Sequence, residues 1–145
     1  MRKTLTFENH YPAAPDRVFD LVSDLDTLHA VTRPWIQFHH LPSGPVRTGQ
    51  VVDVAISVLG LFPARPYRMR VEWCDPTTRQ MRTREDGVGV SSLVHDLRVV
   101  ADGTGARLLD RIEIDAGWKT PLLAVLAWWL YRWRHHVRLR LIAQD

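Results

Sequence analysis

The feature that most constrains the fold is one long amphipathic segment near the end of the chain, from Thr120 to Ile142. At about 100° per residue, its apolar side chains fill a stripe somewhat wider than half of a helix circumference. The stripe consists of Leu122, Leu123, Val125, Leu126, Trp129, Leu130, Trp133, Val137 and Leu141. Thr120 is placed to cap this helix, and Pro121 takes the first helical position, where a missing N–H costs nothing. We therefore predict a single helix of about 23 residues that packs this stripe against the rest of the domain.

The opposite face of the predicted helix is basic and unusually aromatic. It carries Arg132, Arg134, His135 and Arg138, interleaved with Trp128, Tyr131 and Leu139. The simplest interpretation is a solvated face whose arginine stems cover neighbouring rings. The alternative is a surface that touches a partner or an anionic membrane, together with an apolar hairpin tip. Its residues would be Leu61, Phe62, Trp128, Tyr131, Arg132 and Arg138.

Length and composition narrow the class of protein. The 145 residues fit one domain, 1–145, that is large enough to bury a core of its own. Cys74 is the only cysteine, which excludes an internal disulfide and fits a reducing cytoplasm. The first residues contain no apolar stretch typical of a secretory signal, and the longest uncharged apolar run is about half of what a spanning helix needs. We therefore expect a cytoplasmic protein.

Between the first residues and the closing helix, the hydrophobic pattern is mostly that of strands. After Trp35 the period changes to two and stays there for about 80 residues. We predict strands over 3–9, 35–41, 50–59, 67–73, 79–84, 91–100 and 106–115. Two short helices fall between the first two strands; Pro15 opens the first helix, Asp24 or Asp26 caps the second, and Pro34 ends it.

This order of elements constrains the architecture. A meander of antiparallel strands with one apolar face needs a cover, and only the closing helix is long enough to provide it. We therefore predict an α+β fold of the helix-grip type. A curved antiparallel sheet of about six or seven strands wraps around the long C-terminal helix, and two short helices follow the first strand.

Five fragments, in order along the chain, resemble those of a known family. They are the strand, proline and helix opening over 7–19, Thr32-Arg33-Pro34-Trp35 ("PPW"), Glu72-Trp73-Cys74-Asp75-Pro76 ("EWEPP"), His95-Asp96-Leu97-Arg98 ("HxHRF") and Leu109-Asp110-Arg111-Ile112-Glu113 ("TDRVE"). With these fragments the sequence resembles the SRPBCC superfamily of START-like, polyketide-cyclase-like and pollen-allergen-like domains. The resemblance implies a cavity between sheet and long helix that holds a hydrophobic ligand such as a lipid, sterol or polyketide. Leu97 replaces the second histidine of the family's "HxH" pair, which puts any activity that needs both histidines in question.

A histidine and a carboxylate are candidates for chemistry inside such a cavity. His95 shares a strand face with Leu93 and Leu97, and Asp110 shares a face with Ile112 on the next strand. The turn between these strands places the two side chains within about 5 to 8 Å of each other. A carboxylate beside an imidazole can fix its tautomer and raise its pKa, which suits proton transfer or ligand orientation. A structural pair that satisfies itself in the core is equally consistent with the pattern.

The most direct functional expectation is binding without chemistry. We expect carriage, sequestration or presentation of a hydrophobic small molecule, with the predicted ligand-binding residues Trp35, Tyr67, Met69, His95, Leu97, Asp110, Ile112, Leu126, Trp129 and Trp133. The first alternative is a polyketide aromatase/cyclase in which His95, Asp110 and Tyr67 orient the substrate and move protons. The second alternative is a peripheral lipid-handling protein that touches a membrane.

Several other classes of function are disfavoured. The chain contains no GxGxxG, Walker or GxSxG motif, so nucleotide-dependent and serine-hydrolase chemistries are not expected. Adjacent histidines at 39–40 and 135–136 point in different directions and do not chelate by themselves, so we predict no metal and no cofactor. A helix that uses one face as core and lacks a helix-turn-helix partner has limited reach into DNA, and we expect no nucleic acid. The oligomeric state stays open, with a homodimer among the alternatives.

Overall fold

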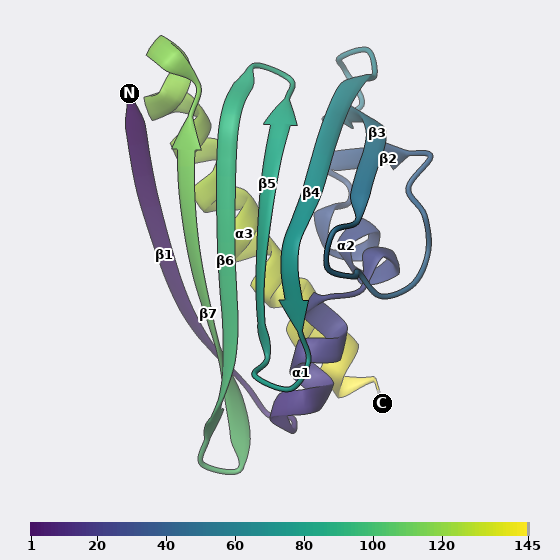
Figure 1. The fold of residues 1–145 in the computed structure, drawn as a ribbon, viewed down its shortest axis with the longest axis vertical. Helices are drawn as coiled ribbons and strands as arrows, with labels where there is room; N and C mark the ends of the chain where they lie inside the picture. Colours follow the sequence, from purple (N-terminus) through teal and green to yellow (C-terminus); the bar gives the residue numbers. More distant parts are fainter. Residues whose placement is uncertain (145) are drawn as a thin grey trace.

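The computed structural model describes residues 1–144 as one antiparallel sheet with helices packed on a single face (Figure 1). In chain order the elements are β1 (Arg2–Tyr11), α1 (Pro15–Val22), α2 (Leu25–Thr32), β2 (Ile36–His39), β3 (Val51–Val58), β4 (Arg65–Asp75), β5 (Gln80–Gly87), β6 (Val90–Asp102), β7 (Gly105–Asp115), a short 3-10 turn (Gly117–Lys119) and α3 (Thr120–Ala143). The strand order is β1-β7-β6-β5-β4-β3-β2, and α3 runs diagonally behind the sheet. The predicted helix-grip architecture is confirmed.

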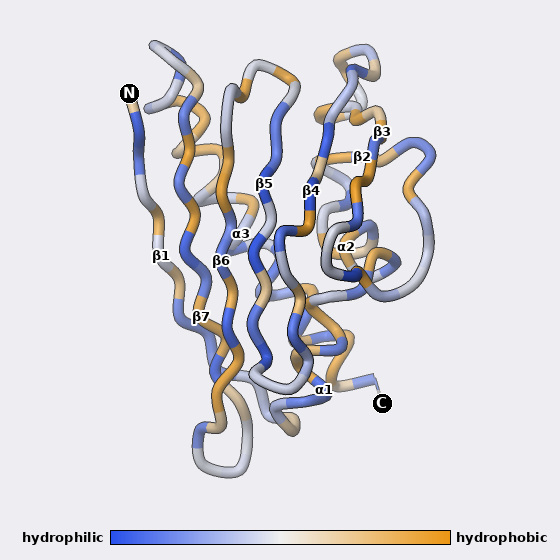
Figure 2. The backbone as a smooth tube through the Cα atoms, in the orientation of Figure 1, coloured by the Kyte–Doolittle hydropathy of each residue, from blue (hydrophilic) through white to orange (hydrophobic). Residues whose placement is uncertain are grey.

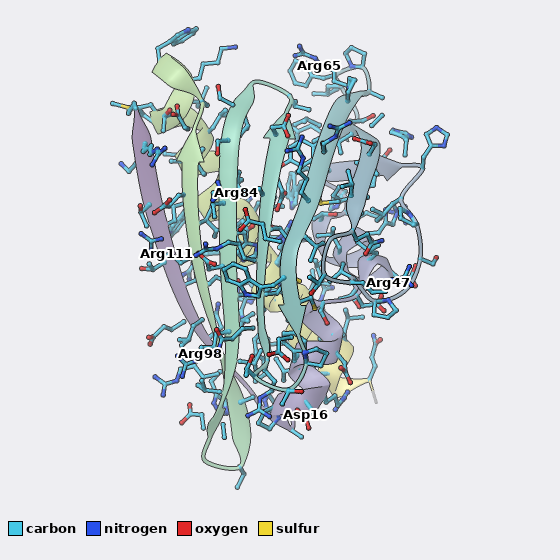
Figure 3. All side chains as sticks on the ribbon, viewed as in Figure 1. Asp16, Arg47, Arg65, Arg84, Arg98 and Arg111 are labelled. Atoms are coloured by element: carbon cyan, nitrogen blue, oxygen red, sulfur yellow. The ribbon has the colours of Figure 1, made fainter. Side chains whose placement is uncertain are left out.

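The two faces of the sheet follow from the alternation along its strands, which Figure 2 shows as alternating hydrophobic and hydrophilic residues. On β6 and β7 the large buried apolar side chains are Leu97, Val99, Leu108, Ile112 and Ile114. Arg84, Arg98 and Arg111 lie on the opposite face, away from α3 (Figure 3). A register shift between Val71 and Trp73 turns Trp73 outward, where the Arg82 guanidinium lies 4.4 Å from the centre of its ring. Any internal site therefore lies on the face that α3 covers.

The two short helices close one side of the space between sheet and α3. Pro15 lies in the first turn of α1, as predicted. Of the two predicted caps for α2, Asp24 is the one used: its carboxylate accepts hydrogen bonds from the backbone N–H groups of Asp26 and Thr27, at 2.8 and 3.2 Å. In Figure 1, α1 and α2 lie beside the second half of α3.

The orientation of α3 differs from the sequence-based prediction. Its buried residues are Thr120, Ala124, Tyr131, Arg134, Arg138 and Ile142. None of them belongs to the stripe predicted to be core, and three of them, Tyr131, Arg134 and Arg138, belong to the face predicted to be solvated. Leu122 and Val125, from the stripe predicted to be core, are 62% and 64% exposed, and Leu126 and Trp129 are each 51% exposed. The prediction of the inner face was therefore wrong.

Side-chain size and aromatic packing explain this orientation. Ala124 is buried and Ala127 half-buried, and their small side chains let α3 approach the sheet closely, against β1 and β7. Tyr131 stacks on Phe7 of β1, with ring centroids 5.6 Å apart. A leucine stripe turned inward would have placed bulky side chains where the fold has room for small ones.

The start of α3 also differs from the prediction. Lys119 is the N-cap residue, and it makes no side-chain cap hydrogen bond. Thr120 is instead fully buried: its hydroxyl donates to the Gly117 carbonyl at 2.7 Å and accepts from the Ala116 N–H at 2.9 Å. Its oxygen also lies 3.2 Å from the carbonyl oxygen of Met1. Thr120 therefore fixes the turn before the helix rather than capping the helix. Within residues 1–144, no helix is both long and apolar enough to cross a bilayer.

Candidate functional site

A cavity of about 70 Å³ lies between the sheet and the three helices. Its wall joins two hydrophobic clusters, because Val71, Met81 and Leu97 come from one and Val52 and Met69 from another. Its charged and polar lining residues are Ser23, Asp24, Thr27, Thr83, Glu85, His95, Arg134 and Arg138. Pockets for drug-sized ligands have volumes of roughly 300–1,000 Å³, so a ligand of that size requires wall side chains to move. The two methionines of the wall are the side chains best able to do so.

The structure places only some of the predicted ligand-binding residues at this cavity. Met69, His95 and Leu97 line it. Tyr67 and Asp110 are not in the wall. The Tyr67 hydroxyl donates to Glu85 and the Asp110 carboxylate accepts from His95, and both of these partners line the cavity. Ile112 is buried and packs with Tyr131 in a separate cluster.

The remaining predicted ligand-binding residues lie outside the cavity. Trp35 makes edge-to-face contacts with Trp129 and Trp133, at centroid distances of 6.1 and 5.6 Å. The Trp133 indole N–H donates to the Arg33 carbonyl, and the side chain of Leu126 is half exposed. The three of these side chains that belong to α3 were expected in the wall because the opposite face of the helix was expected to face the sheet.

His95 and Asp110 form a buried pair, as their strand register predicts. His95 lies opposite Ile112, one diagonal from Asp110, and its Nε2 is 2.7 Å from the Asp110 Oδ1. An ionised carboxylate only accepts, so Nε2 carries the proton, and Nδ1 is left to accept from the Tyr131 hydroxyl at 3.3 Å. Tyr131 was not predicted as a partner because it was placed on the solvated face.

Burial and neighbouring charges set the protonation of this chain of residues. Burial alone would raise the pKa of Asp110, but the hydrogen bond from His95 and the charges of Arg138 and Arg134 outweigh it, so the pKa lies below its usual value. Burial raises the pKa of Tyr131 far above its usual value, so its hydroxyl stays protonated and donates. The three residues are therefore a charged acceptor (Asp110), an imidazole (His95) and a neutral donor (Tyr131) in series.

Tyr67 belongs to a second network. Its hydroxyl donates to the Glu85 Oε1 at 2.9 Å, while the Thr83 hydroxyl donates to Oε2 at 2.8 Å. Burial and the charge of Glu85 raise the pKa of Tyr67 well above its usual value. No hydrogen bond within the described part of the chain joins Tyr67 to His95 or Asp110. Tyr67 is therefore not part of the hydrogen-bonded chain of His95 and Asp110, whose third member is Tyr131.

Two arginines of α3 complete the wall, and the sequence analysis missed both as cavity residues. Arg134 and Arg138 are only 9% and 5% exposed, and the Nε of each has no hydrogen-bond partner within residues 1–144. The Arg134 guanidinium lies 4.5 Å from the centre of the Tyr131 ring. The signal that could have found them is the spacing of Ala124, Ala127 and Tyr131 with the arginines, which follows one helix face.

The predicted membrane or partner surface is therefore only partly exposed. Leu61, Phe62, Trp128 and Arg132 are exposed, whereas Tyr131 and Arg138 are buried and cannot belong to it. Of the paired histidines, His39 Nε2 lies 2.8 Å from the Ser57 hydroxyl, and His135 Nδ1 lies 2.9 Å from the Tyr11 hydroxyl. In the part of the chain that the structure describes, no three histidine, cysteine or acidic side chains gather in a way that could hold a metal ion.

A curved antiparallel sheet closed by a long C-terminal helix, with a cavity between them, defines a helix-grip domain. The crystal structure of Ara h 8.0201 is similar over 100% of both chains, with a TM-score of 0.74 and 13% identity. Protein CV1439 from Chromobacterium violaceum is similar over 98% of each chain, with a TM-score of 0.79 and 15% identity. A START superfamily protein from Mycobacterium smegmatis is similar over 97% of each chain, with a TM-score of 0.72 and 13% identity.

No curated protein matches the sequence significantly. The family described as "Polyketide cyclase / dehydrase and lipid transport" matches residues 2–134. The chain therefore belongs to this family, and the resemblance seen in its five fragments is confirmed. Family and fold together make it a hydrophobic ligand-binding domain of the SRPBCC type.

Proposed function

We propose that the protein binds and carries a small hydrophobic molecule in the cavity between its sheet and α3. The observation that carries this proposal is the cavity wall, in which apolar side chains of five strands and two short helices surround a few converging polar groups. Such a wall removes an apolar molecule from water, while the polar groups orient one end of it. Transport, sequestration or presentation would all use this binding step.

The test combines detection of a carried molecule with a change in cavity size. Native mass spectrometry of the purified protein should show a bound molecule, and the ligand-free protein should take up the uncharged fluorophore N-phenyl-1-naphthylamine. Val52→Phe fills the cavity and should weaken uptake by about tenfold or more. Val51→Phe is the matched control, because Val51 directly precedes Val52 in β3 and is exposed on the other face of the sheet. Protein that is always empty and takes up no fluorophore, or equal uptake by both variants, would contradict the proposal.

A second candidate function, a cyclase or dehydratase acting on a polyketide-like substrate, is favoured by the buried His95–Asp110–Tyr131 chain. The contact between His95 Nδ1 and Tyr131 is the longer of the two, so a substrate that displaced Tyr131 would meet a basic nitrogen. His95 would take a proton from the carbon between two carbonyls, and the enolate would attack a third carbonyl of the same molecule. The protonated His95 would then return its proton to the new alkoxide, so no oxidant or reductant is needed.

This candidate is tested by cyclisation of a synthetic polyketone. His95→Ala and Asp110→Asn should each lower the rate by about 100-fold or more, whereas Tyr67→Phe should leave the rate nearly unchanged because Tyr67 bonds Glu85 instead. Turnover that survives both of the first two substitutions would show that the pair is not the acid and base.

A further inference from the structure

We propose that the carried molecule has a carboxylate at one end, bound by Arg134 and Arg138; this inference rests on the proposed carriage function. Both arginines line the cavity and are at least nine-tenths buried. They are four residues apart on α3, so their side chains lie on the same face of the helix. The protein thus places two arginine side chains in the wall of a cavity that is otherwise mostly apolar.

Neither guanidinium is neutralised by a close partner. No carboxylate of residues 1–144 lies within ion-pair distance of Arg134 or Arg138, and both Nε atoms lack an acceptor. Arg138 contacts the Tyr11 hydroxyl, which is a neutral partner. A buried cation without a close counter-charge is costly, so an acceptor in the cavity would stabilise this arrangement.

The carboxylates near the cavity accept hydrogen bonds from donors other than the two arginines. Asp110 accepts from His95, and both oxygens of Glu85 accept from the hydroxyls of Tyr67 and Thr83. Asp24 caps α2 through two backbone N–H groups. These acids partly compensate the positive charge of the arginines but supply no hydrogen bonds to them. Acceptors for the open N–H donors of the two arginines must come from elsewhere.

A carboxylate matches these donors in charge and in geometry. The planar guanidinium presents parallel N–H groups that fit the two oxygens of a carboxylate, and such charge-assisted pairs are among the stronger hydrogen bonds in proteins. An alcohol or ketone of the same length offers one neutral acceptor and gains less. The apolar remainder of the molecule would contact the wall formed by Met69, Val71 and Leu97.

The experiment compares decanoate with decanol, which share a chain length and differ in the charge of one end. Calorimetric titration of the wild-type chain should show decanoate binding more tightly by about 10- to 100-fold. Arg134→Met and Arg138→Lys should remove most of this difference, largely by weakening decanoate. Arg140→Met is the matched control, because Arg140 is exposed on the same helix and should leave both affinities unchanged.

The outcomes separate this inference from the function on which it rests. If neither compound nor the uncharged fluorophore binds, the carriage proposal fails. If decanol binds as tightly as decanoate to the wild-type chain, carriage stands and the carboxylate site is wrong; this comparison needs no variant.

A different observation carries a second inference: we infer that the outer face of α3 docks on an anionic lipid bilayer. Its first half presents a contiguous apolar surface, formed with the turn before it by Trp118, Leu122, Val125, Leu126 and Trp129, all of which are exposed. Singly exposed apolar residues are common in proteins, but a continuous stripe of this kind on one helix marks an interaction surface. Tryptophans are also favoured at the boundary between lipid and water.

The positive charges around this surface favour an anionic lipid headgroup over a second copy of the chain. Residues 116–144 contain no aspartate or glutamate, and the exposed cations Lys119, Arg132 and Arg140 lie beside and beyond the apolar stripe. A second copy of the chain docked face to face would bring like charges together. Anionic headgroups would instead pair with the cations while the apolar side chains enter the interface.

Vesicle sedimentation tests this surface. The wild-type chain should sediment with vesicles of phosphatidylcholine mixed with phosphatidylglycerol, and should stay in solution with phosphatidylcholine alone. Leu126→Glu should reduce sedimentation by about tenfold, whereas Val51→Glu, an equal charge change on an exposed residue of β3, should not. Equal sedimentation of both variants would overturn the inference. So would light scattering that shows a wild-type dimer which Leu126→Glu dissociates.

Discussion

The inner and outer faces of α3 are reversed with respect to hydrophobicity. The inner face places Arg134 and Arg138 beside Tyr131 in the cavity wall, and the outer face exposes Leu122 and Trp129. Burying apolar surface stabilises a fold by about 25 cal/mol per Å², so this orientation leaves stabilising burial unused. The comparison teaches that the fit of Tyr131 and the polar groups of the sheet decide which face is turned inward.

The largest effect on the free energy of unfolding is expected when one side chain is removed from each face in turn. Tyr131→Ala should lower the free energy of unfolding by about 3–5 kcal/mol, because it removes the Phe7 stack and leaves a cavity beside His95. Leu122→Ala, on the outer face, should change it by no more than about 0.5 kcal/mol. Urea unfolding followed by circular dichroism measures both. A Leu122→Ala cost above that of Tyr131→Ala would mean that the apolar stripe is the packed face.

A smaller effect is expected from the buried pair that the inner face covers. Asp110→Asn should lower the free energy of unfolding by about 1–3 kcal/mol at neutral pH, since it weakens a charged hydrogen bond to His95. In the folded protein the pKa of Asp110 is below its usual value of 3.8. The carboxylate therefore contributes fully above that value, and the contribution is lost as the pH falls through the lower folded-state pKa.

Urea midpoints measured from neutral to acidic pH test this pH dependence. Wild type should lose stability more steeply than Asp110→Asn at the acidic end. Asp53→Asn is the control, because Asp53 is an exposed carboxylate paired with Arg68 on the surface. Identical acid slopes for wild type and Asp110→Asn would show that Asp110 is not held ionised by its neighbours.

The smallest effect is expected on the outer face itself. Leu126→Gln should change the free energy of unfolding by no more than about 0.5 kcal/mol, because a half-exposed side chain loses little burial. The same urea experiment measures it, with Ala124→Leu as the opposite case. Ala124→Leu should cost about 1–3 kcal/mol, since the extra carbons have no room against the sheet. Similar costs for both variants would remove the distinction between the faces.

The sheet could be predicted because a residue's face on a strand depends only on whether its position is odd or even. The turn at Gly103 joins β6 to β7, so the neighbourhood of His95 and Asp110 followed from counting along the two strands. The hydrogen-bond partner of Tyr67 could not be predicted in the same way. Tyr67 lies opposite Gly87, one diagonal from Glu85, and strand parity alone does not say which acid is closer.

The rotation of α3 could not be predicted from its apolar stripe. That method assumes an apolar interior, whereas the sheet here buries His95 and Asp110 and directs Glu85 into the cavity. The Ala124 and Ala127 positions carried the correct signal, but their small side chains add little to a hydrophobicity pattern. Arg134 and Arg138 were placed outside for the same reason, and with them the most distinctive part of the cavity wall was missed.

The strand order also constrains how the chain folds in time. Every strand from β2 to β7 pairs with its neighbour in sequence, whereas β1 pairs with β7, from Arg2 opposite Asp115 to Tyr11 opposite Ala106. Closing so long a loop costs more chain entropy than closing a hairpin, so we expect β1 to join the sheet late. Substitutions in β1, Phe7→Ala among them, should then speed unfolding more than they slow refolding. The stack of Phe7 on Tyr131 would form in that same step, so the inner face of α3 would become fixed only when the first strand arrives.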